Sequence, residues 1–406
     1  MANTAQVKSD AAPFLDVSRP DFSIRSPEVI AAREASWYAN TPYGIAVLRY
    51  SEMSRLIPSR KLRQGSYAWP AHNDATGTFA DWWMRMLLSQ EGAEHGRLRA
   101  MAAPAFAPEL IASLKPKFEL LANELIDAFE PDGRCEFMAA FAEPYAARVV
   151  LTLIDLPHDT WREFADIAVE MGLALGVTYK QDMDRINAAT DRMFGCARDV
   201  IAERRSRPLG ADFLSNLIRA QDEGENRLTD QEVYDMVVLA IFGGIDTTRN
   251  QLGLAMDTFL RHPEQWALLR ERPELASAAV EEVMRYRPTV TWVTREAVED
   301  FEFQGLHIPK GCTIHMFSQS AGSDPRVYEN SGFDITAERA RRHFGFGGGV
   351  HHCLGHFIAR GDMTEALAIL SRRLFHPRFD AEPSYLPDSG NTGPIQLPMA
   401  FDRAAR

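Results

Sequence analysis

A glycine-rich segment carries the reactive side chain with the most distinctive surroundings in the sequence. Residues 346–359 read FGGGVHHCLGHFIA, so Cys353 follows three glycines and precedes an amphipathic stretch, residues 354–374, with helical spacing. Glycine adopts backbone angles closed to other residues, which lets a loop turn tightly and approach a flat ligand. Backbone N–H groups of the loop and of the following helix N-terminus favour a thiolate. The segment therefore predicts a metal-ligating Cys353.

Two other interpretations start from the same residues. His351, His352 and Cys353 could belong to a zinc site, but structural zinc takes four ligands, and no second Cys/His pair has a suitable spacing. An inert buried cysteine is the ordinary expectation for one cysteine taken alone. The other three cysteines lie far apart, without a glycine loop or a Cys-x-x-Cys pair. This usage favours a reducing compartment over a disulfide framework.

A second chemically unusual segment lies inside the best-marked helix. The pattern predicts a helix over residues 230–261, begun by a capping box of Thr229 and Glu232. At 1.5 Å per residue it would be about 48 Å long and would cross a whole domain. Its middle, residues 243–248, reads GGIDTT, and two adjacent glycines cost about 2 kcal/mol relative to alanine there. The segment therefore serves something other than helix stability.

Two explanations fit these glycines. The simpler one is a close crossing with another helix, which the absence of a side chain permits. The other depends on Asp246 and Thr247, because the Thr247 hydroxyl can bond to the Gly243 carbonyl four residues back and open the helix locally. The Asp-Thr pair favours this second explanation.

Three segments together resemble the cytochrome P450 family. Phe346-x-x-Gly349-x-x-x-Cys353-x-Gly355 is similar to that family's haem-ligand loop, residues 282–285 (EVMR) to its Glu-x-x-Arg helix, and residues 243–248 to its oxygen-activating helix. They occur in the family's order and spacing, and the agreement extends from about residue 43 to about residue 401. The resemblance implies one domain over residues 1–406. It implies a mainly α fold with smaller β-sheets, in which haem lies between a long central helix and the helix after the cysteine loop.

The resemblance also assigns the cofactor and its contacts. The cofactor would be haem b, iron protoporphyrin IX, with the Cys353 thiolate as axial ligand of the iron. Amide groups near Leu354 and Gly355 would tune that ligand, and the buried propionates would need cationic or hydrogen-bonding partners. The propionate partners implied are His95, Arg99, Arg295 and His351. The remaining cofactor contacts implied are Phe346, Gly243 and Gly244.

The Glu282–Arg285 pair is expected to be structural and to buttress the haem loop. Family members usually complete this pair with a further arginine, often four residues after the phenylalanine of a Phe-Asp segment. Here that position is Ala337, and the interval to the cysteine loop is about one residue longer than in many bacterial relatives. Arg339 is the expected substitute.

The activity implied is that of a bacterial-type monooxygenase that inserts one oxygen atom of O₂ into a hydrophobic molecule. Asp246 and Thr247 would be its catalytic residues, supplying protons. The sequence has no Walker loop, flavin fingerprint or iron–sulfur cysteine set, so electrons would come from a separate ferredoxin and ferredoxin reductase, or from a flavodoxin-type donor. The expected docking patch consists of Arg97, Arg341, Arg342 and Arg360. A peroxide-driven peroxygenase and a catalytically silent haem-binding module are the alternatives.

The substrate pocket is expected in five segments, residues 78–86, 171–177, 241–247, 291–293 and 392–395. Their apolar and aromatic side chains indicate a hydrophobic ligand, such as a terpenoid, steroid, aromatic or macrolide-like compound. Each tryptophan is more often a core residue than a pocket residue. The pocket candidates are Trp82, Trp83, Leu175, Phe242, Trp292, Val293 and Ile395.

Composition agrees with an ordinary globular enzyme. The 406 residues are 46% hydrophobic and 25% charged, with a formal net charge of −12. The acidic balance disfavours non-specific nucleic-acid binding. The N-terminus lacks the apolar core of a signal peptide, and the longest apolar run, residues 236–245, is far short of the roughly 20 residues needed to span a bilayer. We therefore expect a cytoplasmic protein without a membrane anchor.

The elements that must position these groups follow from periodicity. Residues 37–56 predict a small sheet, residues 79–269 are mainly helical in pattern, and residues 301–317 alternate around a turn as a β-hairpin does. Helix returns after Cys353. The loosest connections are expected at residues 207–210 and 221–226.

Overall fold

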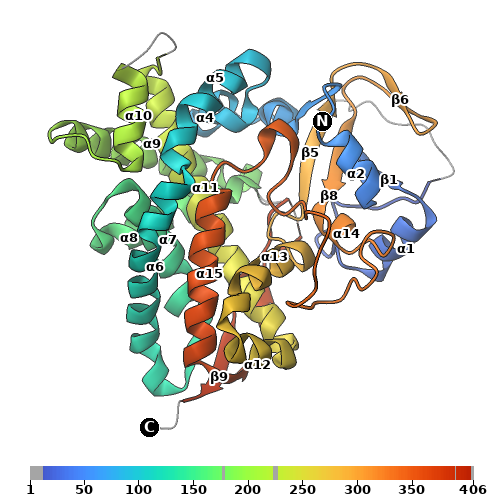
Figure 1. The fold of residues 1–406 in the computed structure, drawn as a ribbon. Coiled ribbons are helices and arrows are strands. Elements are labelled where there is room, and N and C mark those ends of the chain that lie inside the picture. The colour runs from blue at the N-terminus through green and yellow to red at the C-terminus, as the bar shows by residue number, and fades with distance from the viewer. Residues whose placement is uncertain (1–11, 176–178, 223–226, 389, 404–406) are drawn as a thin grey trace.

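The computed structural model describes residues 12–175, 179–222, 227–388 and 390–403. Long helices gather on one side of the molecule, and the strands of the largest sheet lie on the other side with the N-terminal helices (Figure 1). The mainly α architecture with smaller sheets agrees with the prediction. No helix in these described ranges is long and apolar enough to cross a membrane.

The central helix α11 (Asp230–Arg261) has the predicted length and start. The Thr229 side chain accepts the Glu232 N–H, and the Glu232 side chain accepts the Thr229 N–H, which completes the capping box. Every residue from Asn250 to Leu260 is buried. Such a helix must be covered on all sides, and α7 (Glu143–Ile154), α8 (Trp161–Gly172) and α9 (Tyr179–Arg205) pack along it.

Helix α15 (His356–Arg373) follows the cysteine loop and packs against α6 (Pro108–Phe129) and α13 (Ala276–Tyr286). It begins two residues later than the predicted start at residue 354, because Leu354 and Gly355 still form a turn. The other α-helices are α1 (Pro27–Ala35), α2 (Tyr50–Leu56), α3 (Trp69–Asn73), α4 (Thr78–Arg85), α5 (Gly92–Ala102), α10 (Phe213–Asp222), α12 (Pro263–Glu271) and α14 (Ser318–Gly322).

The largest sheet has the strand order β1-β2-β8-β5-β3. Its neighbours are antiparallel except β2 and β8, which run parallel. The strands are β1 (Tyr38–Thr41), β2 (Gly44–Val47), β3 (Leu62–Gln64), β5 (Trp292–Ala297) and β8 (Thr313–Phe317). Because side chains alternate along a strand, Val293 and Arg295 of β5 lie on one face and Trp292 on the other. This alternation decides which β5 residues reach the site.

Smaller sheets complete the fold. They are β4-β12-β9, β10-β11 and β6-β7, formed by β4 (Arg134–Glu136), β12 (Pro398–Asp402), β9 (Phe375–Phe379), β10 (Ser384–Tyr385), β11 (Pro394–Gln396), β6 (Phe301–Phe303) and β7 (Leu306–Ile308). The predicted sheet over residues 37–56 is confirmed as β1 and β2 followed by α2. The predicted hairpin over residues 301–317 is confirmed in its first half only, because β8 joins the large sheet instead.

The two expected loose connections have different outcomes. Residues 207–210 lie between α9 and α10 outside regular structure. Of residues 221–226, Gln221 and Asp222 belong to the end of α10, and residues 223–226 lie outside the described residues.

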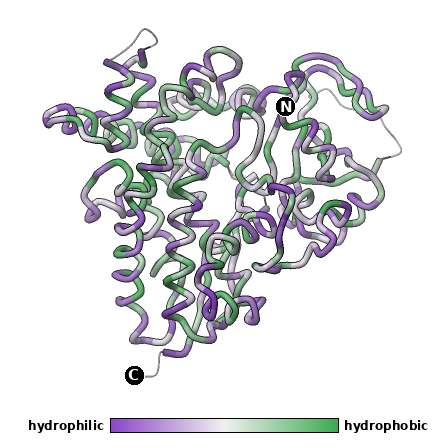
Figure 2. The backbone as a smooth tube through the Cα atoms, in the orientation of Figure 1, coloured by the Kyte–Doolittle hydropathy of each residue, from purple (hydrophilic) through white to green (hydrophobic). Residues whose placement is uncertain are grey.

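The hydrophobic core is divided between the helices and the sheet. The largest group of buried apolar side chains lies among the helices, and two smaller groups lie against the large sheet. Hydrophobic and hydrophilic residues alternate along many of the helices (Figure 2), as expected of helices that turn one apolar side toward the core. The cysteine loop runs between these parts, since Phe346 belongs to the helical core and the preceding Phe344 to a sheet core.

Candidate active site

The glycines of the cysteine loop fit against the protein itself. Gly347 and Gly349 have φ values of +68° and +67°, in the left-handed region that favours glycine. A Cβ on Gly348 would lie 2.9 Å from the Ile57 Cδ1, and one on Gly349 would lie 3.0 Å from the Ile57 carbonyl oxygen. The Cys353 N–H donates to the Phe346 carbonyl at 3.0 Å and closes the loop. The glycines therefore seat the loop against the end of α2, a contact that the sequence did not predict.

The Cys353 thiol is accessible although protein surrounds it. The side chain is exposed, yet burial among neighbouring atoms raises the pKa of the thiol. The Gly355 N–H, hydrogen-bonded to the sulfur, and the positive charges of Arg99 and Arg360 act in the opposite direction. The loop amide and cations thus favour the thiolate as expected, but burial outweighs them. A bound cation would tip this balance toward the thiolate.

The two glycines of α11 have different surroundings. A Cβ on Gly244 would lie 2.8 Å from the Val150 Cγ2, so Gly244 permits a close crossing with α7. A Cβ on Gly243 would meet no atom within 4 Å, and Gly243 is exposed between the buried residues Phe242 and Ile245. The close-crossing explanation therefore applies to Gly244, whereas α11 continues as a helix through Gly243. An exposed glycine in the middle of a core helix marks an internal space beside α11.

Hydrogen bonds hold the side chains of Asp246 and Thr247. The Thr247 hydroxyl donates to the Gly243 carbonyl at 2.5 Å, as predicted. Asp246 is half-buried, and its Oδ2 accepts from the Asn250 Nδ2 at 3.2 Å and from the Asn391 Nδ2 at 2.6 Å. Arg249 lies 3.7 Å from the Asp246 Oδ1. The contact with Asn391, 145 positions away, had no signal in the sequence.

The expected propionate partners are buried or half-buried polar side chains in three segments. His95 and Arg99 lie on α5, and Arg99 donates to the His352 carbonyl at 2.6 Å. Burial, together with the charges of His351 and Arg99, lowers the pKa of His95 to about 4. Arg295 is 3% exposed and donates to the Gln64 side chain. Burial lowers the pKa of Arg295 to about 10, and no carboxylate among the described residues lies within ion-pairing distance of it.

His351 brings an acidic residue into the same group. Its Nε2 lies 3.0 Å from the Glu91 Oε1, its ring lies 4.3 Å from that of His95, and its Nδ1 is buried without a partner among the described residues. Glu91 also accepts the Gln64 N–H at 2.6 Å. Burial raises the pKa of Glu91, but the bonds from His351 and Gln64 lower it further, so that the result lies below the usual value. Sequence reasoning missed Glu91, although its position four residues before His95 was an available signal.

These residues fit a haem. Haem would satisfy four features of the site. Its iron would bind the accessible thiol, and its ring would occupy the internal space beside Gly243. Its propionates would pair with the buried cation of Arg295 and with the unsatisfied Nδ1 of His351. The zinc interpretation has no support, because no cluster of three His, Cys, Asp or Glu side chains in the described ranges could hold a metal ion.

The Glu282–Arg285 pair is completed by the arginine that the sequence suggested. Both residues are buried, at 3% and 2% exposure, and Arg285 donates to both Glu282 oxygens at 2.8 and 2.6 Å. Arg339 donates to the same two oxygens at 3.1 and 2.7 Å. Arg285 further donates to the carbonyls of Gly322 and Gly332. The network therefore ties α13 to α14 and to the segment that leads into the cysteine loop.

The aromatic pocket candidates are mostly packed on one another. Trp82 is fully buried, Trp83 is 6% and Phe242 is 8% exposed, and all three belong to one aromatic cluster with Phe79. The Trp82 Nε1 donates to the Asp235 carbonyl, at 3.4 Å. The alternative of core tryptophans therefore describes Trp82 and Trp83 better than the pocket prediction.

The other pocket candidates are not gathered in one place. Val293 faces the cysteine loop, because a Cβ on Gly347 would lie 3.8 Å from its Cγ1. Trp292 points to the opposite face of the sheet, where it stacks on Phe317 and contacts Phe22. Its placement in the pocket is thus not supported by the packing.

Two candidates lie at the ends of their segments. Leu175 is half-buried in a short 3₁₀ turn, and residues 176–177 of the same predicted segment lie outside the described residues. Ile395 is 49% exposed on β11, whose neighbouring Pro394 faces Gly253 of α11.

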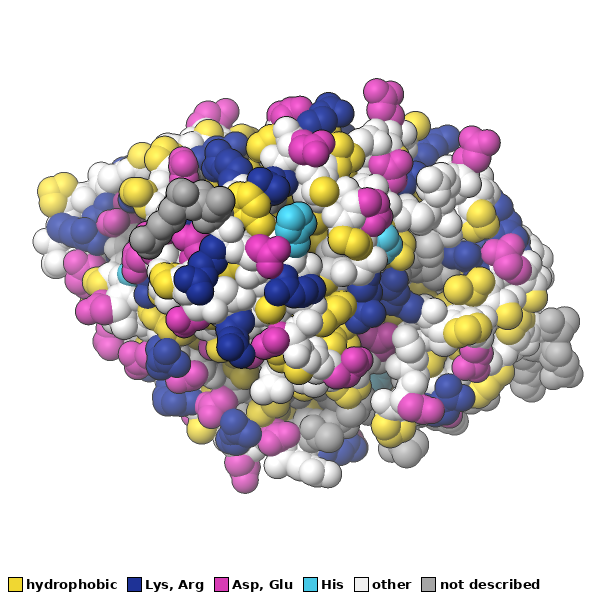
Figure 3. Space-filling model, turned by 90° about the horizontal axis from the view of Figure 1, so that it is seen from below, with side chains coloured by type: hydrophobic (Ala, Val, Ile, Leu, Met, Phe, Trp, Pro, Cys, Tyr) yellow, Lys and Arg dark blue, Asp and Glu magenta, His cyan; other side chains and the backbone are white. Residues whose placement is uncertain are grey.

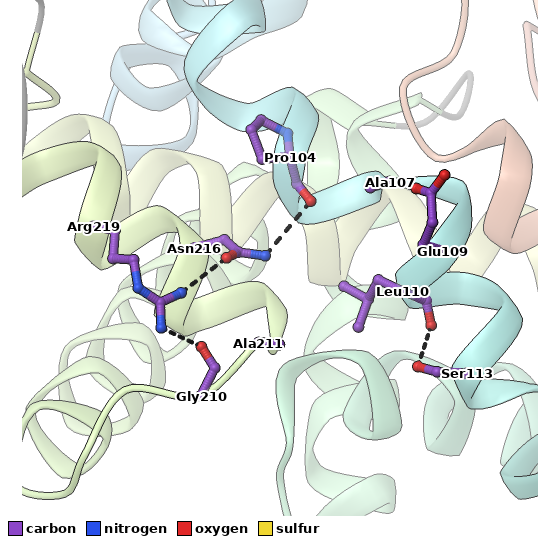
Figure 4. A pocket seen from close by; sticks show the side chains of 9 residues that line it. All are labelled: Pro104, Ala107, Glu109, Leu110, Ser113, Gly210, Ala211, Asn216 and Arg219. Atoms are coloured by element: carbon purple, nitrogen blue, oxygen red, sulfur yellow. Dashed lines mark hydrogen bonds between the residues drawn. The ribbon is translucent and has the colours of Figure 1, made fainter.

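A surface groove of about 490 Å³ lies between the start of α6 with the residues before it and α10 with the residues before it. Figure 4 shows Asn216 and Arg219 on one side of it and Glu109, Leu110 and Ser113 on the other. Three of its polar side chains are already engaged: Asn216 donates to the Pro104 carbonyl, Arg219 donates to Asn216, and Ser113 donates to the Leu110 carbonyl.

The predicted basic patch is partly neutralised. Arg97 pairs with Glu94 and Glu232, and Arg360 pairs with Glu281. Arg341 and Arg342 are exposed, and within the described residues neither has an ion-pair partner. On the face shown in Figure 3, basic and acidic side chains likewise alternate without one continuous region of either sign.

The comparisons with known proteins agree with this site. The family model named Cytochrome P450 matches residues 171–384. The chain is 38% identical to luteothin monooxygenase from Streptomyces thioluteus over the whole of both chains. It is 30% identical to nocardicin C N-oxygenase from Nocardia uniformis subsp. tsuyamanensis over 78% of this chain and 79% of the relative. The crystal structure of CalO2 superposes with a TM-score of 0.87 at 28% identity, covering 95% of this chain and 100% of that one.

Proposed function

The chain belongs to the cytochrome P450 family, whose haem is held by a cysteine thiolate. From this premise we propose the reaction and the electron donor of this monooxygenase. It inserts one oxygen atom of O₂ into a hydrophobic small molecule and receives electrons from a separate ferredoxin with its reductase. The observation that carries the proposal is the retained chemistry of α11. Asp246 and Thr247 are both present and hydrogen-bonded next to the internal space at Gly243.

The residues around Cys353 hold the cofactor. Haem would supply its iron for one-electron and O₂ chemistry at this site. Cys353 ligates that iron, and the Gly355 N–H and the nearby cations stabilise the negative charge of the thiolate. Arg295, His95 and Arg99 would bind the propionates, which would add to the weak counter-charge that Glu91 gives the buried guanidinium of Arg295.

Asp246 and Thr247 handle protons on the other side of the site. The Thr247 hydroxyl, bonded to the Gly243 carbonyl, stays beside the open space and presents its oxygen lone pairs there. Asp246 takes up protons from solvent and releases them toward that space, as a general acid held by Asn250 and Asn391. A carboxyl group in such a place contributes a typical 10²- to 10⁴-fold, roughly, to rate.

The electron donor docks beside the cysteine loop. Arg341 and Arg342 supply exposed positive charge there, and Val350 and Phe357 are exposed apolar side chains, at 65% and 42%, on either side of Cys353 in sequence. A small acidic protein with an apolar centre would match this surface. The patch is smaller than the sequence suggested, since Arg97 and Arg360 are already paired.

The substrate class follows from the relatives and from the buried lining. The relative that matches over its whole length is named luteothin monooxygenase. Luteothin-like compounds are therefore the first candidate substrates for this chain. Phe242 and Val293 would present hydrocarbon surface to such a ligand. A screen for the spectral shift of the haem on ligand addition would rank luteothin against terpenoid, steroid and macrolide compounds.

The proposal is tested by supplying the oxygen atom in two ways, from O₂ with a reductant or from hydrogen peroxide. With a compound that gives the spectral shift, the holoprotein is incubated with O₂, reduced ferredoxin and its reductase, or with hydrogen peroxide alone. We expect hydroxylated or otherwise oxygenated product with the first mixture and little with the second. Product from peroxide alone would indicate a peroxygenase, and no product from either would indicate a haem-binding module. Both results would overturn the proposal.

A further inference from the structure

The loop before β11 reaches the general acid of α11. Asn391 donates from Nδ2 to the Asp246 Oδ2 at 2.6 Å, and its Oδ1 accepts from the Thr289 hydroxyl at 2.7 Å. Thr289 lies between α13 and β5 and is 3% exposed. A chain of hydrogen bonds therefore runs from a buried threonine through an amide to Asp246.

Thr289 is fixed in place by its own backbone. Its N–H donates to the Gln251 Oε1 at 2.8 Å, and its carbonyl accepts the Thr392 N–H at 2.9 Å. Its hydroxyl also has a second acceptor within reach, the Thr392 carbonyl at 2.7 Å. A hydroxyl has one proton to donate and can accept at the same time. The Thr289 hydroxyl can therefore point to Asn391 or to Thr392 without losing a hydrogen bond.

The amide of Asn391 also has two usable orientations. Its oxygen and nitrogen have nearly the same shape, so rotation by 180° exchanges donor and acceptor without moving neighbours. In the first orientation Nδ2 donates to an ionised Asp246, and Thr289 donates to Oδ1. In the second, a protonated Asp246 donates from Oδ2 to the Asn391 Oδ1, Nδ2 donates to the Thr289 oxygen, and Thr289 donates to the Thr392 carbonyl. The contacts of Asn391 with Asp246 and with Thr289 are hydrogen-bonded in both orientations.

We propose that Asn391 and Thr289 are positioning residues that keep Asp246 hydrogen-bonded in both of its protonation states, so that it exchanges a proton without leaving its place. One proton enters from solvent onto the Asp246 Oδ2 and the same proton leaves toward the internal space, while the amide turns over and back. The charge nearest to this carboxyl is Arg249 on the same helix, itself paired with Glu143 of α7. The inference rests on the proposed role of Asp246 in proton delivery.

The chain offers variants that keep shape and remove one function. Thr289→Val removes the hydroxyl, and Asn391→Leu removes the amide. The matched control is Asp388→Ala in the same loop, because Asp388 accepts from the Ser23 hydroxyl and the Ile24 N–H on the other side of the loop and does not touch Asp246. An effect of a loosened loop would appear in all three variants.

The direct readout is the infrared absorption of the Asp246 carboxyl in the haem-loaded protein. A difference spectrum between two pH values that bracket its protonation contains the carboxyl C=O band, which Asp246→Asn identifies by removing it. We expect Thr289→Val and Asn391→Leu to shift this band and Asp388→Ala to leave it in place. A band at the parent frequency in both Thr289→Val and Asn391→Leu would overturn the inference.

Turnover gives the second readout. Thr289→Val should slow product formation by about 3- to 10-fold, the effect of one neutral hydrogen bond, and raise the ratio of the rates in H₂O and D₂O, with the same substrate-induced spectral shift. An equal loss in Asp388→Ala would assign the effect to the loop and contradict the inference. The infrared band tests the hydrogen bonds of Asp246, and turnover tests its role in proton delivery. If Asp246→Asn formed product at the normal rate, the proposed role of Asp246 would be wrong, even if Thr289→Val and Asn391→Leu had shifted the carboxyl band.

Discussion

The two sides of the site are held by different kinds of contact. On the side of the cysteine loop, Glu282, Arg285 and Arg339 form a buried ionic network in which the charges meet other charges or carbonyls of the protein. On the side of α11, Asp246 and Thr247 are held by hydrogen bonds from amide groups and to a carbonyl, beside an internal space. The first arrangement is permanent in a folded chain, whereas the second can exchange partners. The comparison indicates that the first side serves folding and the second serves turnover.

The largest effect is expected from breaking the ionic network. Glu282→Ala leaves the guanidinium groups of Arg285 and Arg339 without a carboxylate, at a cost of about 3–5 kcal/mol in the free energy of unfolding. Denaturant titration and the yield of haem-loaded protein would measure it. The neighbouring Glu281→Ala is the comparison, because Glu281 also pairs with Arg360 and His343 but its side chain is 43% exposed, so its loss should cost less than the loss of Glu282. Equal stability of the Glu282→Ala and parent proteins would show that the network is an ordinary surface bridge.

The opposite result is expected from Asp246→Asn. The amide keeps the shape of the side chain but cannot act as an acid, so turnover should fall by about 10²- to 10⁴-fold, while the free energy of unfolding changes by less than about 1 kcal/mol. Single-turnover rates and denaturant titration measure the two quantities. Normal turnover with reduced stability would show that Asp246 only shapes the helix, and the comparison between the two sides would fail.

Thr247→Ala should change the fate of the electrons. Without the hydroxyl, substrate still gives its spectral shift and reductant is still consumed, but more of it appears as hydrogen peroxide and less as product. Peroxide and product are measured per reductant consumed. Thr248→Val is the control, since Thr248 is buried on the same helix and is not part of the pair. The same product yield in Thr247→Ala and the parent would contradict this role.

Local sequence patterns predicted the elements and the residues that act through their own segment. The capping box of Thr229 and the bond of Thr247 to Gly243 are contacts within four residues, so periodicity and side-chain chemistry were sufficient. Cys353 and its loop followed from glycine spacing. Arg339 was expected because the usual arginine position holds Ala337, and it does complete the Glu282 network.

Contacts between distant segments were beyond such patterns. Asn391 meets Asp246 across 145 positions, and Ile57 meets the loop glycines across about 290. The pocket prediction also included side chains that pack elsewhere. Strand alternation sends Trp292 to the opposite face from Val293, and Trp82 is buried among other aromatic rings. Register and packing, which depend on the whole fold, decide such cases.

The smallest effect is expected at the docking surface. Arg341→Glu with Arg342→Glu should slow reduction by ferredoxin several-fold at low salt, and the difference should shrink as salt rises, since charges more than about 8 Å apart are screened at physiological ionic strength. Stopped-flow reduction measures this. Arg372→Glu, exposed at the far end of α15, is the control for the single Arg341→Glu and Arg342→Glu variants, which change the charge by the same amount. A rate independent of salt in the parent would remove the case for the patch.

The measurement that tests the central claim most directly is the absorption of the ferrous carbon monoxide complex in the parent and in Cys353→Ser. A thiolate ligand gives this complex a strongly red-shifted Soret band. We predict the shifted band in the parent and in Cys312→Ser, and its absence in Cys353→Ser protein that still contains haem. A shifted band that persists in Cys353→Ser would place the iron ligand elsewhere and contradict the account.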